Sequence, residues 1–176
     1  MKELLVICAM MLFGAALAAA KDFVVKIGKE DVKFDSNLLN REITLADKTT
    51  GSQKTALTCS FLFYGLLSEA KIDEASRIST DPQKTKAKWV QAQDRRGKAS
   101  FMNTMDQYFK GENVVVAEIV KGKHHMLVVR SPEYTAAQIY LETAQGFMLD
   151  EGWASADAQL LGKLFTLIQD EEVVLK

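Results

Sequence analysis

The stretch that decides the fold of this chain is Ser52–Pro82, SQKTALTCSFLFYGLLSEAKIDEASRISTDP. In its first part, apolar residues recur at spacings of three and four, which places them on one face of an α-helix: Ala56, Cys59, Phe63, Leu66, Leu67 and Ala70. Ser52 is expected to cap this helix, because a serine hydroxyl accepts a hydrogen bond from a free backbone N–H. A second, short helix is predicted over Ile72–Ile78. Pro82 is expected to end it, since the residue before a proline is disfavoured in the helical conformation.

Three further helices are predicted downstream. Lys84–Arg95 is polar with a few apolar residues, which indicates a partly exposed helix. The next helix carries a methionine and aromatic stripe at helical spacing and stops at Gly111: Phe101, Met105, Tyr108 and Phe109. A final helix is predicted over Ser155–Gln169, with Ser155 as its N-cap.

From Glu112 the pattern changes from helical to extended. Val114–Val120 and His124–Arg130 flank a Lys-Gly-Lys turn and predict a hairpin. Ala137–Thr143 and Phe147–Glu151 predict the next one. Both faces of the first hairpin are largely apolar, so we expect the sheet to be covered on one side. On the other side it should line a cavity or pack again.

The residues before the central helix predict additional strands. Lys21–Asp35 alternates apolar and polar residues around Gly28-Lys29-Glu30, which indicates an N-terminal hairpin. Residues 36–40 are expected to form a loop, and Glu42–Ala46 a third strand. The predicted class is α+β, with helices packed on a curved, mostly antiparallel sheet. Residues 21–176 contain no repeat or long linker and are expected to form a single domain.

Residues 1–20, MKELLVICAMMLFGAALAAA, have the pattern of a secretory signal peptide. A basic residue near the start precedes an apolar run and a small-residue end, with Ala18 and Ala20 at the −3 and −1 positions of a cleavage site. Lys21 would then begin the mature chain; cleavage after Ala18 and an uncleaved anchor are the alternatives. Cys8 lies within the apolar run and not at its end, so lipidation is not expected. The predicted location is the periplasm or the extracellular medium, with no stable membrane insertion after cleavage.

Charge and cysteine content narrow the class of partner. The chain has 22 basic and 23 acidic residues and a formal net charge of −1. Signal cleavage removes one residue of each sign, so this balance indicates no binding to nucleic acid or to an anionic membrane surface. Cleavage also leaves Cys59 as the single cysteine. We expect a buried, inert thiol, as is usual for a free cysteine on an apolar helix face.

The order of a long helix, a short helix, a turn, a helix and a strand meander resembles the nuclear transport factor 2-like (ketosteroid isomerase-like) α+β cone superfamily. Leu66–Pro82, LLSEAKIDEASRISTDP, is similar to that superfamily's opening, where the second helix runs into x-S-x-D-P. The resemblance covers about residues 52–153 and ends at Gly152-Trp153. It implies a cone whose cavity could hold a ligand. The N-terminal strands and the C-terminal helix lie outside this core, and the helix would either plug the mouth of the cone or form a homo-oligomer contact.

Candidate residues for acid–base chemistry are few. Isomerase-type members of the resembling superfamily use a pocket carboxylate as base, but no residue here matches that position by motif. Glu118 lies across a short turn from His124 and His125, and a carboxylate can orient an imidazole and raise its basicity. A solvated pair near a hairpin tip is the competing interpretation. Adjacent histidines on a strand point to opposite faces, so no metal site is predicted, and no motif indicates a cofactor.

Three functions therefore compete. The first is an exported, non-enzymatic binding protein that uses a cone cavity or sheet surface for a protein partner, as an immunity or inhibitor factor does. The second is an isomerase- or dehydratase-like enzyme that uses Glu118 with His124 or His125. The third is a carrier of a small apolar ligand. The predicted ligand-binding residues line the expected cavity: Phe63, Phe101, Met105, Tyr108 and Tyr140.

Overall fold

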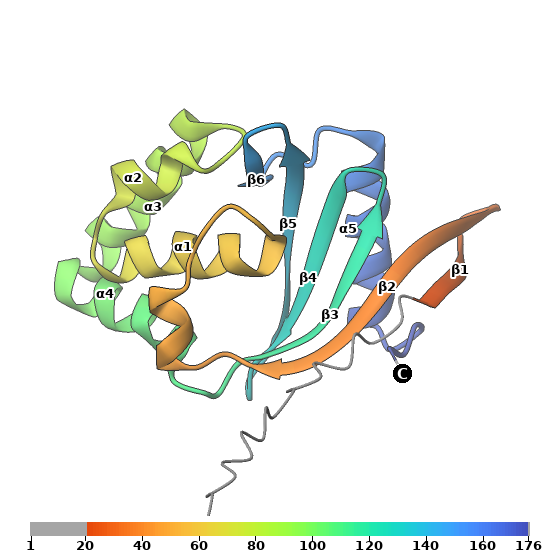
Figure 1. The fold of residues 1–176 in the computed structure, drawn as a ribbon, viewed down its shortest axis with the longest axis horizontal. Coiled ribbons are helices and arrows are strands. Elements are labelled where there is room, and N and C mark those ends of the chain that lie inside the picture. The colour runs from red at the N-terminus through yellow and green to blue at the C-terminus, as the bar shows by residue number, and fades with distance from the viewer. Residues whose placement is uncertain (1–20, 176) are drawn as a thin grey trace, which may run out of the picture.

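The computed structural model describes residues 21–175 (Figure 1). The predicted signal peptide, with Cys8, lies outside these residues. The strands are β1 (Lys21–Ile27), β2 (Glu30–Glu42), β3 (Val114–Lys121), β4 (His124–Arg130), β5 (Thr135–Thr143) and β6 (Gly146–Leu149). The helices are α1 (Ala56–Ser68), α2 (Ile72–Arg77), α3 (Pro82–Arg96), α4 (Lys98–Asp106) and α5 (Ala156–Gln169), with short 3-10 helices η1 (Leu45–Thr49) and η2 (Gln107–Phe109).

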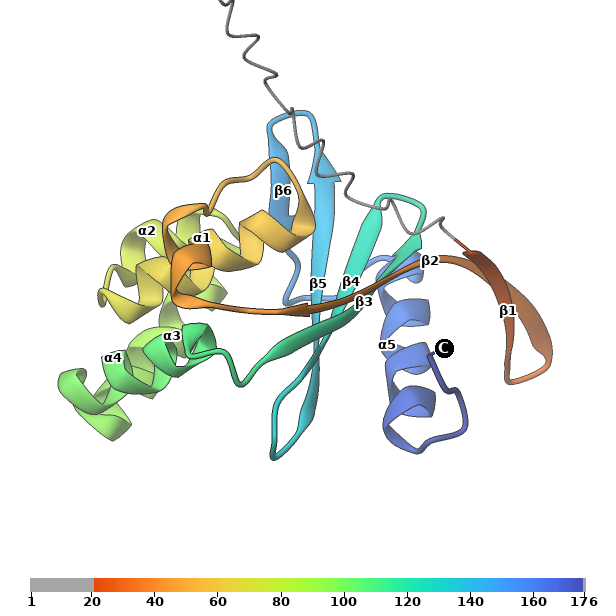
Figure 2. The same cartoon turned by 60° about the horizontal axis from the view of Figure 1, so that its bottom comes forward.

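The strands form one antiparallel sheet in the order β1-β2-β3-β4-β5-β6. Each strand pairs with its neighbour in sequence, and α1–α4 are inserted between β2 and β3. The register shifts between Leu38 and Arg41 in β2 and between Val115 and Ala117 in β3. Such bulges bend a strand and increase its twist, and the sheet is visibly curved (Figure 2). The α+β class and the curved antiparallel sheet are confirmed.

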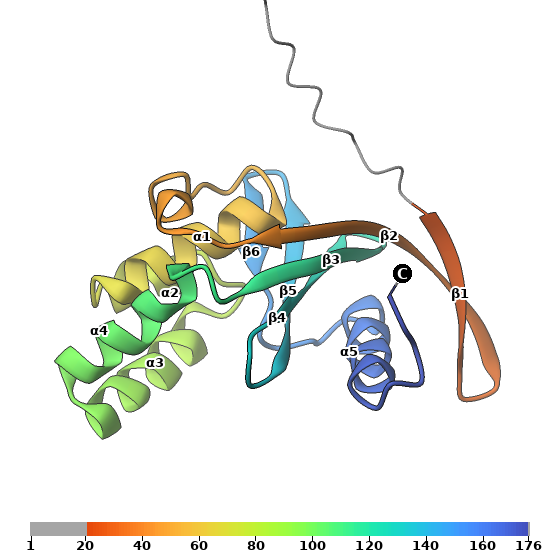
Figure 3. The same cartoon turned by 90° about the horizontal axis from the view of Figure 1, so that it is seen from below.

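Helices cover both faces of this sheet. The group α1–α4 packs on one face, and α5 packs on the other against β1, β3, β4 and β5 (Figure 3). Each interface has its own buried apolar cluster. The sheet therefore packs again on its second face, one of the two outcomes expected from its apolar strands. The C-terminal helix makes this second layer and does not plug a cone mouth.

Both ends of the predicted helical stretch differ from expectation. The N-cap of α1 is Thr55, whose hydroxyl accepts a hydrogen bond from the Thr58 N–H at 3.1 Å. Ser52 lies before this turn and donates to the Thr58 hydroxyl. Pro82 does not end an element but begins α3, with Asp81 as the N-cap. Proline suits the first helical position, because the N–H that it lacks would have no partner there.

The N-terminal strands are longer and fewer than predicted. The expected loop at residues 36–40 belongs to β2, because Ser36, Asn37 and Leu38 pair with β3. The expected third strand is absent, since residues 45–49 form η1. Residues 36–40 show no alternation of apolar and polar side chains, and their extended conformation is imposed by pairing with β3. The remaining predicted helices and hairpins, including Ser155 as the N-cap of α5, are confirmed. No helix within residues 21–175 is long and apolar enough to span a bilayer.

Candidate functional site

A cleft of about 540 Å³ opens beside η2, between the α3–α4 end of the helical layer and the turn that joins β4 to β5. The helical layer contributes Tyr64, Met105 and Tyr108, and β5 contributes Gln138. The remaining lining residues are Arg96, Thr104, Gln107, Glu112, Asn113, Val129, Ser131, Pro132, Glu133, Tyr134 and Ala136. The cleft therefore combines an aromatic wall with polar groups.

A hydrogen-bond network lies at the inner end of the cleft. The Tyr108 hydroxyl donates to Ser60 Oγ at 3.2 Å, and the Gln138 amide nitrogen donates to the Tyr108 hydroxyl at 3.4 Å. The Tyr140 hydroxyl donates to Gln138 Oε1 at 2.9 Å. The rings of Tyr64 and Tyr108 are stacked, with centroids 4.2 Å apart. This network fixes the carboxamide of Gln138, which is a buried residue of the cleft lining.

Burial controls the ionisation of these phenols. It raises the pKa of Tyr108 to about 12, although the hydrogen bonds with Ser60 and Gln138 oppose the rise. Burial also raises the pKa of Tyr64 and of Tyr140 well above the ordinary tyrosine value. Desolvation disfavours the charged phenolate. The phenols thus remain neutral hydrogen-bonding groups near neutral pH.

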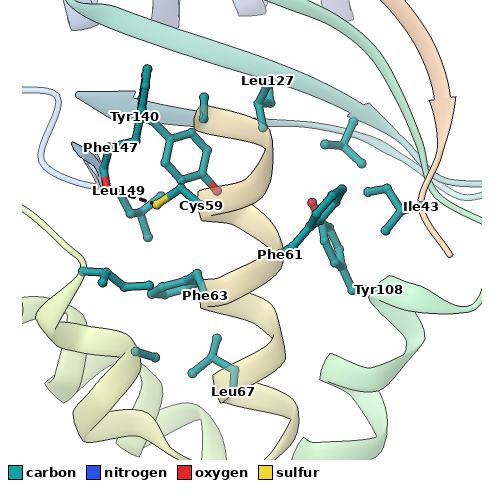
Figure 4. Close-up of a cluster of buried hydrophobic side chains, with 14 of the residues drawn as sticks. Ile43, Cys59, Phe61, Phe63, Leu67, Tyr108, Leu127, Tyr140, Phe147 and Leu149 are labelled. Carbon is teal, nitrogen blue, oxygen red and sulfur yellow. Dashed lines mark hydrogen bonds between the residues drawn. The ribbon is translucent and has the colours of Figure 1, made fainter. Parts of the chain in front are cut away.

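The five predicted ligand-binding residues separate into two groups. Met105 and Tyr108 line the cleft. Phe63, Phe101 and Tyr140 are buried in the apolar cluster of the helical layer. Figure 4 shows Phe63 and Tyr140 where α1 packs against the sheet. Sequence reasoning missed Tyr64 and Gln138. Gln138 had one local signal, because it is a polar residue among the apolar residues in the middle of β5.

Glu118 and His125 form the predicted carboxylate–imidazole pair. Glu118 Oε1 lies 2.8 Å from His125 Nδ1, and Glu142 Oε2 lies 3.9 Å from His125 Nε2. The His125 ring also packs edge-on against Phe147, with centroids 4.8 Å apart. The side chains of His125 and Glu118 are 17% and 22% exposed. The pair is largely covered and lies outside the cleft lining.

His124 points to the opposite face of the sheet, as the strand alternation predicts. Its Nε2 lies 3.1 Å from Ser155 Oγ and 3.6 Å from Asp150 Oδ2. A serine–histidine–aspartate relay needs the serine and the aspartate on different ring nitrogens. Here both contact Nε2, so the arrangement is not a relay. It connects β4 to the N-terminus of α5.

Cys59 and the acidic residues offer no further reactive centre. The Cys59 thiol is buried and donates to the Phe147 carbonyl at 3.2 Å (Figure 4). Burial raises the pKa of this thiol to about 12, so the nucleophilic thiolate is scarce at neutral pH. Among residues 21–175, no three histidine, cysteine, aspartate or glutamate side chains are grouped so as to hold a metal ion.

Comparisons with protein-family models, with curated proteins and with solved structures found no match to this chain. The resemblance to the nuclear transport factor 2-like superfamily stays a prediction.

Proposed function

We propose that this chain is an exported, non-enzymatic binding protein that holds a small ligand in the cleft beside η2. The observation that carries the proposal is a cleft of about 540 Å³ with Tyr108 and Gln138 at its inner end. Small-molecule sites typically enclose about 300–1,000 Å³ and combine apolar walls with a few fixed polar groups. Export rests on the signal-peptide pattern of residues 1–20.

The lining favours a ligand with a flat apolar body and a polar, uncharged end. The stacked rings of Tyr64 and Tyr108 and the side chain of Met105 offer apolar contact. The Tyr108 hydroxyl donates its one proton to Ser60, so it can offer a ligand an acceptor lone pair, and the Gln138 amide can offer its second N–H. Among the charged lining residues, the positive charge of Arg96 is offset by two glutamates, which disfavours a strongly anionic ligand.

Two measurements test ligand binding. Native mass spectrometry of the gently purified protein should reveal a co-purifying small molecule. Fluorescence titration with the uncharged aromatic probe N-phenyl-1-naphthylamine should show saturable binding. Ala136 lines the cleft, so Ala136→Trp should fill it and weaken probe binding, whereas the matched control Ala136→Ser should bind as the parent does. Equal probe binding by both variants, with no co-purifying molecule, would refute the proposal.

A second candidate function rests on the 2.8 Å contact between Glu118 and His125. A carboxylate at this distance can orient the imidazole for general acid–base catalysis in a small-molecule enzyme. Glu118→Gln should then abolish turnover and leave probe binding in the cleft unchanged. Glu142→Gln is the matched control, because Glu142 lies farther from the ring and is more exposed. A Glu118→Gln variant with full turnover would exclude this candidate.

A further inference from the structure

The two edges of the sheet differ in how they are covered. The β6 edge is occupied by backbone of the helical layer: the Leu149 N–H donates to the Ile78 carbonyl, the Thr80 N–H to the Leu149 carbonyl, and the Phe147 N–H to the Gln53 carbonyl. Within residues 21–175, β1 pairs with β2 alone. Its other edge projects away from α1–α4 (Figure 1). An open edge presents unpaired N–H and C=O groups and can pair with another strand.

The hairpin register identifies the groups on this open edge. The turn between β1 and β2 is two residues long and has Gly28 at φ +66°. In such a hairpin the flanking residues, Ile27 and Glu30, form a hydrogen-bonded pair, and hydrogen-bonded and non-bonded pairs then alternate. Val25 and Phe23 therefore bond to β2. The backbone groups of Lys26, Val24 and Asp22 point to the open edge.

These three residues form a self-complementary set. In an antiparallel pairing of β1 with β1 of a second copy, centred on Val24, the two Val24 residues face each other. Each Asp22 then faces Lys26 of the other copy. Opposite charges directly across a strand pair stabilise it, and like charges destabilise it. The Val24 side chain is 63% exposed and would gain a partner at the centre of this pairing.

The side chains of β1 that pack beneath α5 are not the ones that would meet in this pairing. Phe23, Val25 and Ile27 belong to the apolar cluster beneath α5, and only Asp22, Val24 and Lys26 present side chains on the opposite, uncovered face. Asp22 also pairs with Lys33 of β2, with Oδ2 and Nζ 2.5 Å apart. A carboxylate has two oxygens, so it can accept from both lysines.

We propose that two copies of this chain associate through their β1 strands and form a continuous twelve-stranded antiparallel sheet across a two-fold axis at Val24. The proposal is independent of the cleft. A strand pair alone buries less than the roughly 1,200 Å² at which stable specific interfaces begin. The dimer should therefore be in a concentration-dependent equilibrium with the monomer.

Sedimentation velocity of the purified protein at increasing concentration tests the association. Val24→Pro removes the central backbone donor and leaves the bonds to β2 in place, so dimerisation should weaken about tenfold or more. Val24→Thr, which keeps the donor, is the matched control. A protein that remains monomeric at millimolar concentration, or a Val24→Pro variant that dimerises as the parent does, would refute the proposal.

Two variants with reversed charges test the proposed register of the β1–β1 pairing, in which Asp22 faces Lys26 of the other copy. Asp22→Lys alone places two like-charged pairs in the dimer, and so does Lys26→Asp alone, so neither should self-associate. A mixture of the two variants restores both opposite-charge pairs and should dimerise. Mixing cannot repair a misfolded hairpin, so rescue identifies the interface.

Cross-linking then locates the two-fold axis. The Cα atoms of a hydrogen-bonded antiparallel pair are about 5.5 Å apart, within the range of a disulfide. Val24→Cys, in a protein whose Cys8 is replaced by serine, should form a disulfide dimer on mild oxidation. Lys29→Cys, at the hairpin tip, should not. Equal cross-linking at both positions, or failure of the mixed charge variants to dimerise, would overturn the assigned register.

Discussion

The two faces of the sheet are built from different side chains. The face beneath α1–α4 carries Tyr140 and Phe147 from the sheet and seven aromatic residues from the helical layer, which are buried in its apolar cluster or packed against it: Phe61, Phe63, Tyr64, Trp89, Phe101, Tyr108 and Phe109. The face beneath α5 is mainly aliphatic, and Phe34 is its one fully buried aromatic residue among those described. On the first face, a hydrogen-bond network joins the hydroxyls of Tyr108, Tyr140 and Ser60 to the Gln138 carboxamide. We propose that a ligand binds on the first face, whereas the second face buries the aliphatic cluster beneath α5.

The largest expected effect is the loss of stability when a buried side chain is shortened in either of the two apolar clusters. Phe61 is fully buried and packs against Phe109, with ring centroids 6.4 Å apart. Phe61→Ala should lower the free energy of unfolding by about 3–5 kcal/mol, and Leu161→Ala, beneath α5, by about 2–5 kcal/mol. Urea unfolding followed by circular dichroism measures both.

Both variants should unfold in one transition, because the two clusters share the same strands. Leu45→Ala is a control on an exposed side chain and should change stability by about 0.5 kcal/mol or less. An early, separate transition in Leu161→Ala alone would show that α5 unfolds independently of the rest.

The second effect is alkaline destabilisation of the aromatic face. Tyr108 has an ordinary pKa of 10.0, which burial raises to about 12 in the folded chain. The stabilisation is fully present below pH 10.0 and is lost as the pH rises towards 12, because the unfolded chain ionises first. A difference of this size corresponds to about 2–3 kcal/mol.

Phenolate absorbance during a pH titration measures this effect. Three of the four tyrosines, Tyr64, Tyr108 and Tyr140, should ionise only well above the ordinary value or on unfolding. Tyr108→Phe should reduce the loss of stability between pH 10 and 12. Simultaneous ionisation of all four tyrosines in the folded protein would contradict the assigned burial.

Local sequence patterns predicted the elements that local physics determines. The helix α1, the turn between β3 and β4 and the Ser155 cap all depend on neighbouring residues, and the structure confirms them, although Ala70 lies beyond the end of α1. The Glu118–His125 contact was predictable for the same reason, since a short turn brings these residues together.

Ser52 and Pro82 were local errors about helix ends, whereas the larger errors arose where distant segments decide the conformation. Ser36, Asn37 and Leu38 are extended because they pair with β3, which lies far along the chain. The cleft is another such case, since Tyr64, Tyr108 and Gln138 meet only after the helical layer packs on the sheet. Periodicity identifies the inward face of each element, but it does not show which inward residues end in a core and which in an opening.

The smallest expected effect is the loss of stability when a helix cap is removed on either face of the sheet. Thr55 caps α1 and Ser155 caps α5, each by accepting a bond from the N–H three residues on. Replacement of such a cap by alanine typically costs about 1 kcal/mol. Ser155 also contacts the buried His124 Nε2 at 3.1 Å, and its loss leaves that nitrogen with Asp150 at 3.6 Å. An unsatisfied buried polar group adds to the cost.

Ser155→Ala should therefore destabilise the protein more than Thr55→Ala, as measured by the urea midpoint at constant slope. Ser155→Thr, which keeps the hydroxyl, should recover most of the difference. Equal midpoints for Ser155→Ala and Thr55→Ala would mean that His124 contributes nothing to the attachment of α5. The α5 layer would then be held to the sheet by its aliphatic contacts alone.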